Sequence, residues 1–79
     1  MDAQQVQNLI QASIPDAKVT VSGGEGKFEA TVVSSAFEGL MPVKRHQLVY
    51  ATVRKQIADG SLHALTIRPL TPEESEKTG

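Results

Sequence analysis

The stretch KVTVSGGEGKFEATVVS, residues 18–34, decides the fold. Val19 and Val21 alternate with polar residues over positions 18–22, and a second alternating run extends from Phe28 to Ser34. Alternation of this kind predicts two half-buried strands. The loop between them, Gly23–Lys27, contains three glycines, which allow the chain to turn sharply. Two strands joined by a glycine-rich loop predict a β-hairpin.

Helices are predicted on both sides of this hairpin. Residues 2–14 have apolar side chains at helical spacing, with Asp2 as the N-cap and Pro15 forcing the helix to end. A connector over residues 35–41 can form a short helical turn. A second helix is predicted from Pro42 to Ala58, because proline suits the first turn of a helix. Its apolar stripe comprises Val49, Val53 and Ile57.

The last part of the chain predicts a third strand and a short final helix. The strand covers Leu62–Leu70. Thr71-Pro72-Glu73-Glu74 has the form of a capping box, with Thr71 as the cap and Glu74 three residues later. We expect the tail, residues 75–79, to fray. The order α-β-β-α-β-α predicts a single α+β domain over residues 1–79. It has a three-stranded mixed sheet with helices packed on one face. If the second and third strands lie side by side and parallel, the helix between them makes a right-handed crossover.

Composition limits the functions that this chain can have. It has 79 residues, a formal net charge of −1 and no cysteine. A near-zero charge argues against binding nucleic acid through bulk electrostatics. Without cysteine, the chain alone cannot form a thiolate metal site, and it suits a reducing compartment such as the cytoplasm. No apolar run approaches the roughly 20 residues of a membrane helix. We therefore expect a cytoplasmic protein that does not enter membranes.

The two histidines are the candidates for binding chemistry. His46 lies in the second predicted helix, one turn before Tyr50, and is either a surface side chain or a polar contact to a partner. His63 opens the third predicted strand, on the same face as Leu65 and Ile67 by strand periodicity. Two interpretations of His63 stay open, a half-buried ring bonded to backbone or a metal ligand at a strand edge.

Neither catalysis nor a basic binding face is indicated by the remaining motifs. The Gly23–Lys27 loop lacks the spacing of a phosphate-binding loop, and no nucleophile is placed beside a base. Helical geometry places Lys44 and Lys55 about 20° apart, but Arg45 and Arg54 about 180° apart. The basic residues therefore wrap around the helix, and we expect a protein that is not an enzyme.

Several motifs together resemble those of the BolA family, and within it the IbaG-like branch. They occur in the family's order and span nearly the whole chain. The motifs are Phe37-Glu38-Gly39, Val43 to Tyr50 (VKRHQLVY), Ser61 to Ile67 (SLHALTI) and Leu70-Thr71-Pro72-Glu73-Glu74.

The resemblance implies a class II KH-like fold and a monothiol glutaredoxin as the partner. In such pairs a [2Fe–2S] cluster is held by the glutaredoxin cysteine, a glutathione thiolate and a BolA histidine, here His63. A second BolA ligand comes from the hairpin loop. In this chain Lys27 stands where many members have histidine and Gly24 where others have cysteine. Glu25, a water or a residue of the partner is then the candidate for this position, and the alternative is a complex without a cluster. The isolated chain is expected to be a monomer without a cluster, and the complex a heterodimer.

The resemblance also implies which residues contact a partner, and a second function. Gly24 and Lys27 are predicted beside the ligand, and a docking surface or basic patch is predicted at Lys44, Arg45 and His46. The alternative function is a KH-like transcriptional regulator that binds DNA. Against it, Gly39-Leu40-Met41-Pro42 contains only the first glycine of the Gly-x-x-Gly motif of KH domains.

Overall fold

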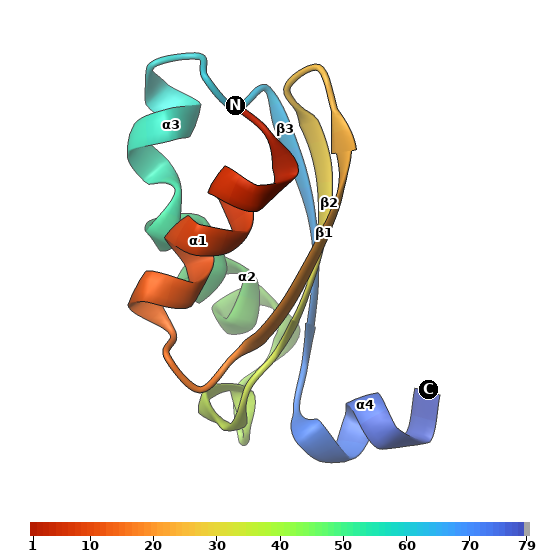
Figure 1. Ribbon diagram of the computed structural model, residues 1–79. Helices are drawn as coiled ribbons and strands as arrows, with labels where there is room; N and C mark the ends of the chain where they lie inside the picture. Colours follow the sequence, from red (N-terminus) through yellow and green to blue (C-terminus); the bar gives the residue numbers. More distant parts are fainter. Residues whose placement is uncertain (79) are drawn as a thin grey trace.

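The computed structural model describes residues 1–78, which form a three-stranded sheet with helices. The elements, in chain order, are α1 (Ala3–Ser13), β1 (Lys18–Gly24), β2 (Lys27–Val33), the 3-10 helix η1 (Ser35–Phe37), α2 (Pro42–Thr52), α3 (Arg54–Ala58), β3 (Ala64–Leu70) and α4 (Pro72–Thr78) (Figure 1). The predicted α+β class and the mixed sheet are confirmed.

The sheet has the strand order β1-β2-β3. β1 and β2 are antiparallel, and Gly24 pairs with Lys27. β2 and β3 lie side by side and are parallel, and Lys27 pairs with Ala64 at their first residues. The hairpin is confirmed, but its loop is shorter than predicted: only Glu25 and Gly26 lie in the turn. Both have positive φ, 55° and 80°, as the tight hairpin turn that suits strand twist requires.

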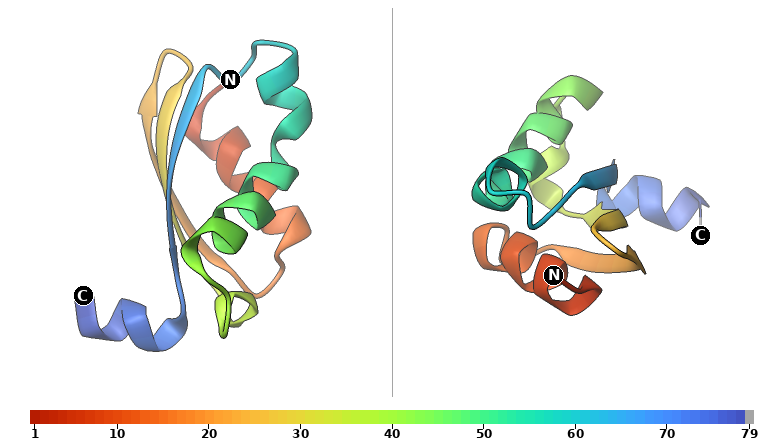
Figure 2. Two further views of the ribbon diagram at one scale, coloured as in Figure 1. Left: turned by 180° about the vertical axis from the view of Figure 1, so that it is seen from behind. Right: turned by 90° about the horizontal axis from the view of Figure 1, so that it is seen from above.

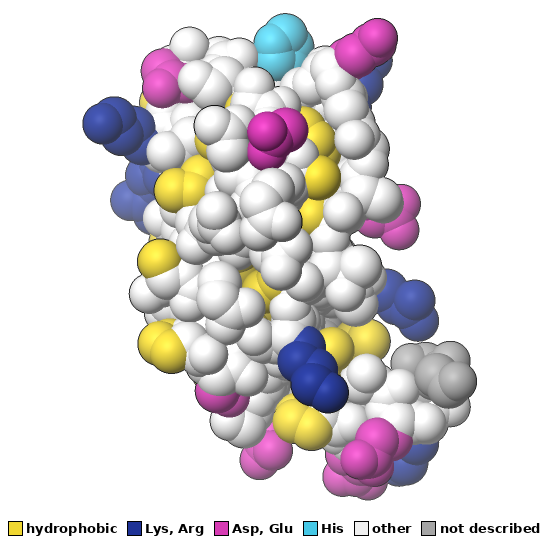
Figure 3. Space-filling view, in the orientation of Figure 1, with side chains coloured by type: hydrophobic (Ala, Val, Ile, Leu, Met, Phe, Trp, Pro, Cys, Tyr) yellow, Lys and Arg dark blue, Asp and Glu magenta, His cyan; other side chains and the backbone are white. Residues whose placement is uncertain are grey.

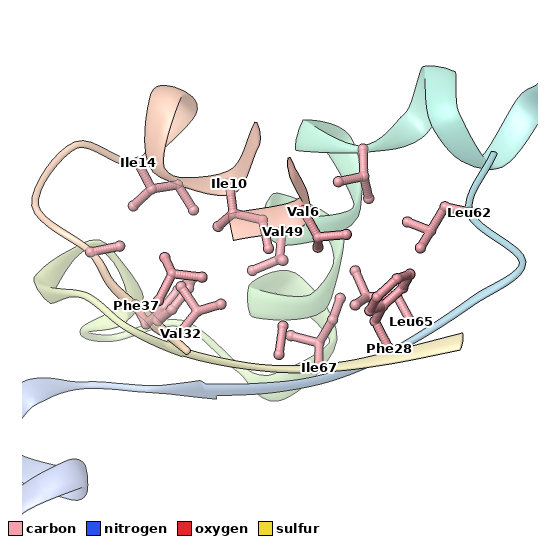
Figure 4. Packing of buried hydrophobic residues seen from close by; sticks show 14 residues of the cluster. Val6, Ile10, Ile14, Phe28, Val32, Phe37, Val49, Leu62, Leu65 and Ile67 are labelled. Atoms are coloured by element: carbon pink, nitrogen blue, oxygen red, sulfur yellow. The ribbon is translucent and has the colours of Figure 1, made fainter. Parts of the chain in front are cut away.

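Helices α1, α2 and α3 cover one face of the sheet, and the core lies between them (Figures 1 and 4). Alternate strand residues point into this core, as the period of two predicts. The fully enclosed side chains include Val6, Ile10, Val32, Phe37, Val49, Val53 and Leu62. The opposite face of the sheet carries mostly exposed polar residues.

The second predicted helix is interrupted, which corrects the single helix over residues 42–58. Val53 has φ −124° and ψ 14°, and its N–H bonds to the carbonyl of Tyr50, three residues back. This break separates α2 from α3 and changes the direction of the apolar stripe. Val49 and Val53 are buried, as predicted, whereas Ile57 is 40% exposed.

Helix α4 lies beyond the end of the sheet, away from the other three helices (Figure 2). Its predicted capping box is confirmed. The Thr71 N–H donates to Oε1 of Glu74 at 2.9 Å, and the Glu74 N–H donates to Oγ1 of Thr71 at 3.2 Å. The segment 75–79, predicted to fray, is helical as far as Thr78, and Gly79 lies outside the described residues.

Side chains from α2 bond to the outer edge of β3. The Tyr50 hydroxyl donates to the carbonyl of Leu65 at 2.8 Å, and Arg45 Nη1 lies 3.4 Å from the carbonyl of Pro69. Pro69 itself has no N–H to leave unpaired, which suits an edge strand. These bonds protect an edge that could otherwise pair with another chain.

Across residues 1–78, every helix is too short or too polar to cross a membrane.

Candidate metal-ligand and partner-binding site

His63 lies in the loop just before β3, at the hairpin end of the sheet. Its backbone N–H donates to the carbonyl oxygen of Gly26 at 2.8 Å, and the N–H of Ala64 donates to the same oxygen at 2.9 Å. These two bonds attach the start of β3 directly to the hairpin turn. The histidine's position is therefore set by two elements of regular structure and not by a free loop.

The His63 side chain is exposed, whereas Leu65 and Ile67 are each 6% exposed. Among residues 1–78, none makes a hydrogen bond with its ring nitrogens, and the ring lies against Gly26. The interpretation of a half-buried ring bonded to backbone is therefore wrong, because only the main chain of His63 is bonded. A histidine side chain is visible at this end of the molecule (Figure 3). An exposed imidazole without an internal partner has a nitrogen available to bind a metal.

Three other predicted residues lie beside His63. Gly24 ends β1, Lys27 begins β2, and Glu25 occupies the turn between them. Glu25 and Lys27 are both exposed. No group of three or more metal-binding side chains occurs within the described part of the chain. This end can offer the His63 nitrogen and the Glu25 carboxylate, so the remaining ligands of any metal there must come from another molecule.

The predicted residues Lys44, Arg45 and His46 lie elsewhere, on α2. Arg45 reaches the carbonyl of Pro69, close to the C-terminal end of β3, whereas His63 precedes its first residue. The seven residues of β3 span roughly 20 Å at about 3.3 Å each. The structure therefore does not bring this group of residues together with His63.

Arg45, predicted as part of a docking surface or basic patch, also has a role within the chain. It is only 14% exposed, and Nη1 lies 2.6 Å from Oε1 of Glu74. Its Nε also donates to the carbonyl of Leu40 at 2.9 Å. The guanidinium thus connects the loop before α2 with α4, because its fixed fork of donors can bond several oxygens at once.

His46 and Lys44 stay candidates for contacts with a partner. Lys44 is exposed and His46 is half-buried. Nδ1 of His46 lies 2.9 Å from the carbonyl of Pro42, one turn earlier in α2, and Tyr50 bonds to β3 instead of to His46. Acidic and basic side chains are dispersed over the face shown in Figure 3 and do not form a single basic patch.

The Arg45–Glu74 ion pair predicts how stability changes in acid. The Arg45 guanidinium, together with the Thr71 N–H, lowers the pKa of Glu74 from 4.5 to about 2. Since the folded state binds this proton more weakly, ionised Glu74 stabilises the fold above pH 4.5, and this contribution is lost as the pH falls toward 2. Glu74→Gln should therefore be less stable than the parent near neutral pH. The difference between their free energies of unfolding should shrink as the pH falls from 4.5 toward 2, as urea unfolding at several pH values would show.

Glu73→Gln is the matched control for that measurement. Among the described residues, Glu73 forms an ion pair with Lys77 alone, at 3.0 Å, and both side chains are more than 70% exposed. Exposed pairs of this kind contribute little to stability. If the free energies of unfolding of the parent and of Glu74→Gln fall equally on acidification, the Arg45–Glu74 ion pair does not make the predicted contribution.

Comparison with known families identifies a relationship over most of the chain. The sequence model described as BolA-like protein matches residues 4–74. An uncharacterized protein from the rpoN-murA intergenic region of Acinetobacter guillouiae is 47% identical over 77 residues, which cover 98% of this chain and 93% of that protein. Acid stress protein IbaG of Escherichia coli K12 is 32% identical over 74 residues, covering 94% of this chain and 88% of IbaG.

Solved structures agree with this relationship. A BolA protein homologue from Coxiella burnetii superposes with a TM-score of 0.85 at 28% identity, covering 96% of this chain and 97% of that one. The BolA domain of SufE1 from Arabidopsis thaliana gives a TM-score of 0.79 at 30% identity, covering 91% and 93%. The fold and the family thus agree, while the class II KH-like label stays a prediction.

Proposed function

This chain belongs to the BolA family, and from that premise we propose that it acts as a binding partner of a monothiol glutaredoxin and catalyses no reaction itself. The pair would share a [2Fe–2S] cluster and serve in iron–sulfur cluster handling or iron-linked regulation. The single observation that supports this proposal most is the exposed His63 imidazole, which has no hydrogen bond within residues 1–78.

The donor atoms of this chain suit one ligand position of such a cluster. Iron in a [2Fe–2S] cluster accepts imidazole nitrogen in place of thiolate, as Rieske centres show. His63 would supply that nitrogen, and the absence of cysteine means that the thiolates would come from the glutaredoxin and from glutathione. Glu25 is the second candidate ligand, although its oxygen suits this iron less well than nitrogen or sulfur. Gly24 and Lys27 would contact the partner beside it.

This division of ligands explains why the isolated chain is expected to hold no cluster. One imidazole and one carboxylate at an exposed end cannot enclose two irons. We therefore propose a monomer that forms a heterodimer only with its partner. We place this activity in the cytoplasm, because a reducing compartment keeps the partner's thiols available.

Nucleic-acid binding is the weaker alternative for this chain. Its net charge is −1, and Arg45 is engaged with Glu74 instead of facing outward. A titration with labelled DNA at several salt concentrations tests this function. Genuine binding would weaken steeply as salt rises, because counterions are released on association.

The proposed function predicts that His63→Ala changes the spectrum of the heterocomplex. The chain is mixed anaerobically with a monothiol glutaredoxin, glutathione, iron and sulfide, and visible absorption and circular dichroism are recorded. We expect the parent to show a cluster spectrum that His63→Ala loses or shifts, because the ligand nitrogen is gone. His46→Ala removes the other histidine, which is a candidate docking residue and not a candidate ligand. The complex that this variant forms should keep the band positions of the parent spectrum, whatever its affinity.

Two outcomes would contradict this proposal in different ways. A parent chain that forms no cluster-bearing complex with any monothiol glutaredoxin tested would refute the partner. A His63→Ala spectrum identical to that of the parent would remove His63 as the ligand, even if the complex forms.

A further inference from the structure

We propose that Gly26 is a positioning residue for the His63 imidazole: it holds the backbone of His63, and it provides the space in which the ring lies. The contact between Gly26 and His63 lies within the isolated chain and needs no partner or metal. Its importance for binding iron rests on the function proposed above. Gly26 itself would supply no ligand atom.

The space occupied by the ring exists only because residue 26 has no side chain. A Cβ atom at this position would lie 2.8 Å from Cδ2 of His63, 3.0 Å from Cγ and 3.4 Å from Cβ. Separations under about 3.4 Å are shorter than ordinary carbon–carbon contact. Any residue other than glycine would therefore displace the ring, which can rotate about its side-chain bonds.

The ring meets Gly26 with its carbon atoms. The three heavy atoms nearest to the Cβ position are all carbons of His63, so both ring nitrogens lie farther away. Contact with the glycine therefore uses the part of the imidazole that cannot bind a metal. It leaves the nitrogen lone pairs available to an incoming group.

The backbone of Gly26 restrains the same residue. Its carbonyl oxygen accepts hydrogen bonds from the N–H groups of His63 and Ala64, at 2.8 and 2.9 Å. With its main chain held, His63 retains only its two side-chain rotations, and contact with the glycine restricts these further. Ordering a ligand before the partner arrives lowers the entropic cost of forming the bond.

Two other glycines allow backbone strain to be separated from this steric effect. Gly26 has φ +80°, which disfavours any other residue. Gly60 and Gly39 have nearly the same angle, +82° and +77°, but an added Cβ there would meet no atom within 4 Å. Gly60→Ala and Gly39→Ala therefore introduce comparable strain without touching His63.

The first experiment measures ring position by nuclear magnetic resonance on the isolated chain, without iron or partner. In the parent we expect a nuclear Overhauser effect between Hδ2 of His63 and the Hα protons of Gly26. Gly26→Ala should lose the effects from Hδ2 to residues 25–27 and shift the ring nitrogen resonances. Gly60→Ala should keep both.

The design stays decisive if alanine at position 26 prevents folding. Gly26→Asn adds the same Cβ with a residue that tolerates positive φ better. The parent spectrum is a test in itself, because absence of the effect between His63 and Gly26 would overturn the proposal. So would an unchanged ring position in either folded variant of Gly26.

The second experiment repeats the cluster reconstitution with the glutaredoxin. We expect Gly26→Ala to lose or shift the visible circular dichroism while Gly60→Ala resembles the parent. If the parent itself forms no cluster, the proposed function fails but the ring measurement stands. If Gly26→Ala moves the ring and yet gives the parent spectrum, the proposed function survives and the positioning role of Gly26 is refuted.

Discussion

Replacing Phe37 by alanine should lower the free energy of unfolding by about 4 kcal/mol, the range for a fully buried phenylalanine. Phe37 ends η1 and is completely enclosed by the core under α1 and α2 (Figure 4). A chain of this length has a total stability of roughly 4–12 kcal/mol, at about 0.05–0.15 kcal/mol per residue. Phe37→Ala is therefore expected to lose between about a third and all of this stability. Urea unfolding followed by circular dichroism would measure the loss.

Ile57→Ala is the control for this substitution. Ile57 is 40% exposed, so its truncation removes little buried surface and should lower stability by less than about 1 kcal/mol. If both variants unfold at similar urea concentrations, the burial of Phe37 described here is wrong.

Replacing Arg45 by methionine should release α4 and lower stability by roughly 2 kcal/mol, as for lost hydrogen bonds to charged groups. Methionine keeps the apolar stem but removes the bonds to Leu40, Pro69 and Glu74. Because α4 makes few other contacts with the sheet, the amide protons of Glu74 and Ser75 should exchange faster with solvent. Hydrogen exchange and urea unfolding together measure the two effects.

Lys44→Met provides the matched comparison, since Lys44 is the exposed neighbour of Arg45 on α2. It should leave both exchange and stability almost unchanged. Unaltered exchange at α4 in Arg45→Met would mean that the bonds of Arg45 do not hold this helix in place.

Those parts of the fold that depend on neighbouring residues could be predicted from the sequence. Asp2 caps α1 by accepting from the N–H of Gln5 at 2.9 Å, and Pro42 occupies the first turn of α2. The hairpin and the capping box of α4 also arise where they were expected. Each of these features requires only side chains a few positions apart or a single period of alternation.

The residues at the hairpin end of the sheet were predicted from the sequence, but the contacts between them were not. The positions of His63 and Glu25 near the hairpin followed from strand order and the family resemblance. The bond from His63 to the carbonyl of Gly26 did not, because it joins segments that meet only when β3 pairs with β2. Gly26 was therefore assigned only to the turn, although its positive φ and its place beside the ring serve different purposes.

By itself, the sequence determined the order of strands and main helices, the caps of α1 and α4, and the antiparallel hairpin, because backbone preference and side-chain period act locally. Only the tertiary structure decided which polar side chains are free. Arg45 turns inward to Glu74, 29 residues away, and Asp16 accepts from Ser34 and Ser35, 18 and 19 residues away. Charge and polarity are readable in a sequence, but whether a group is already bonded depends on where the chain brings its partners.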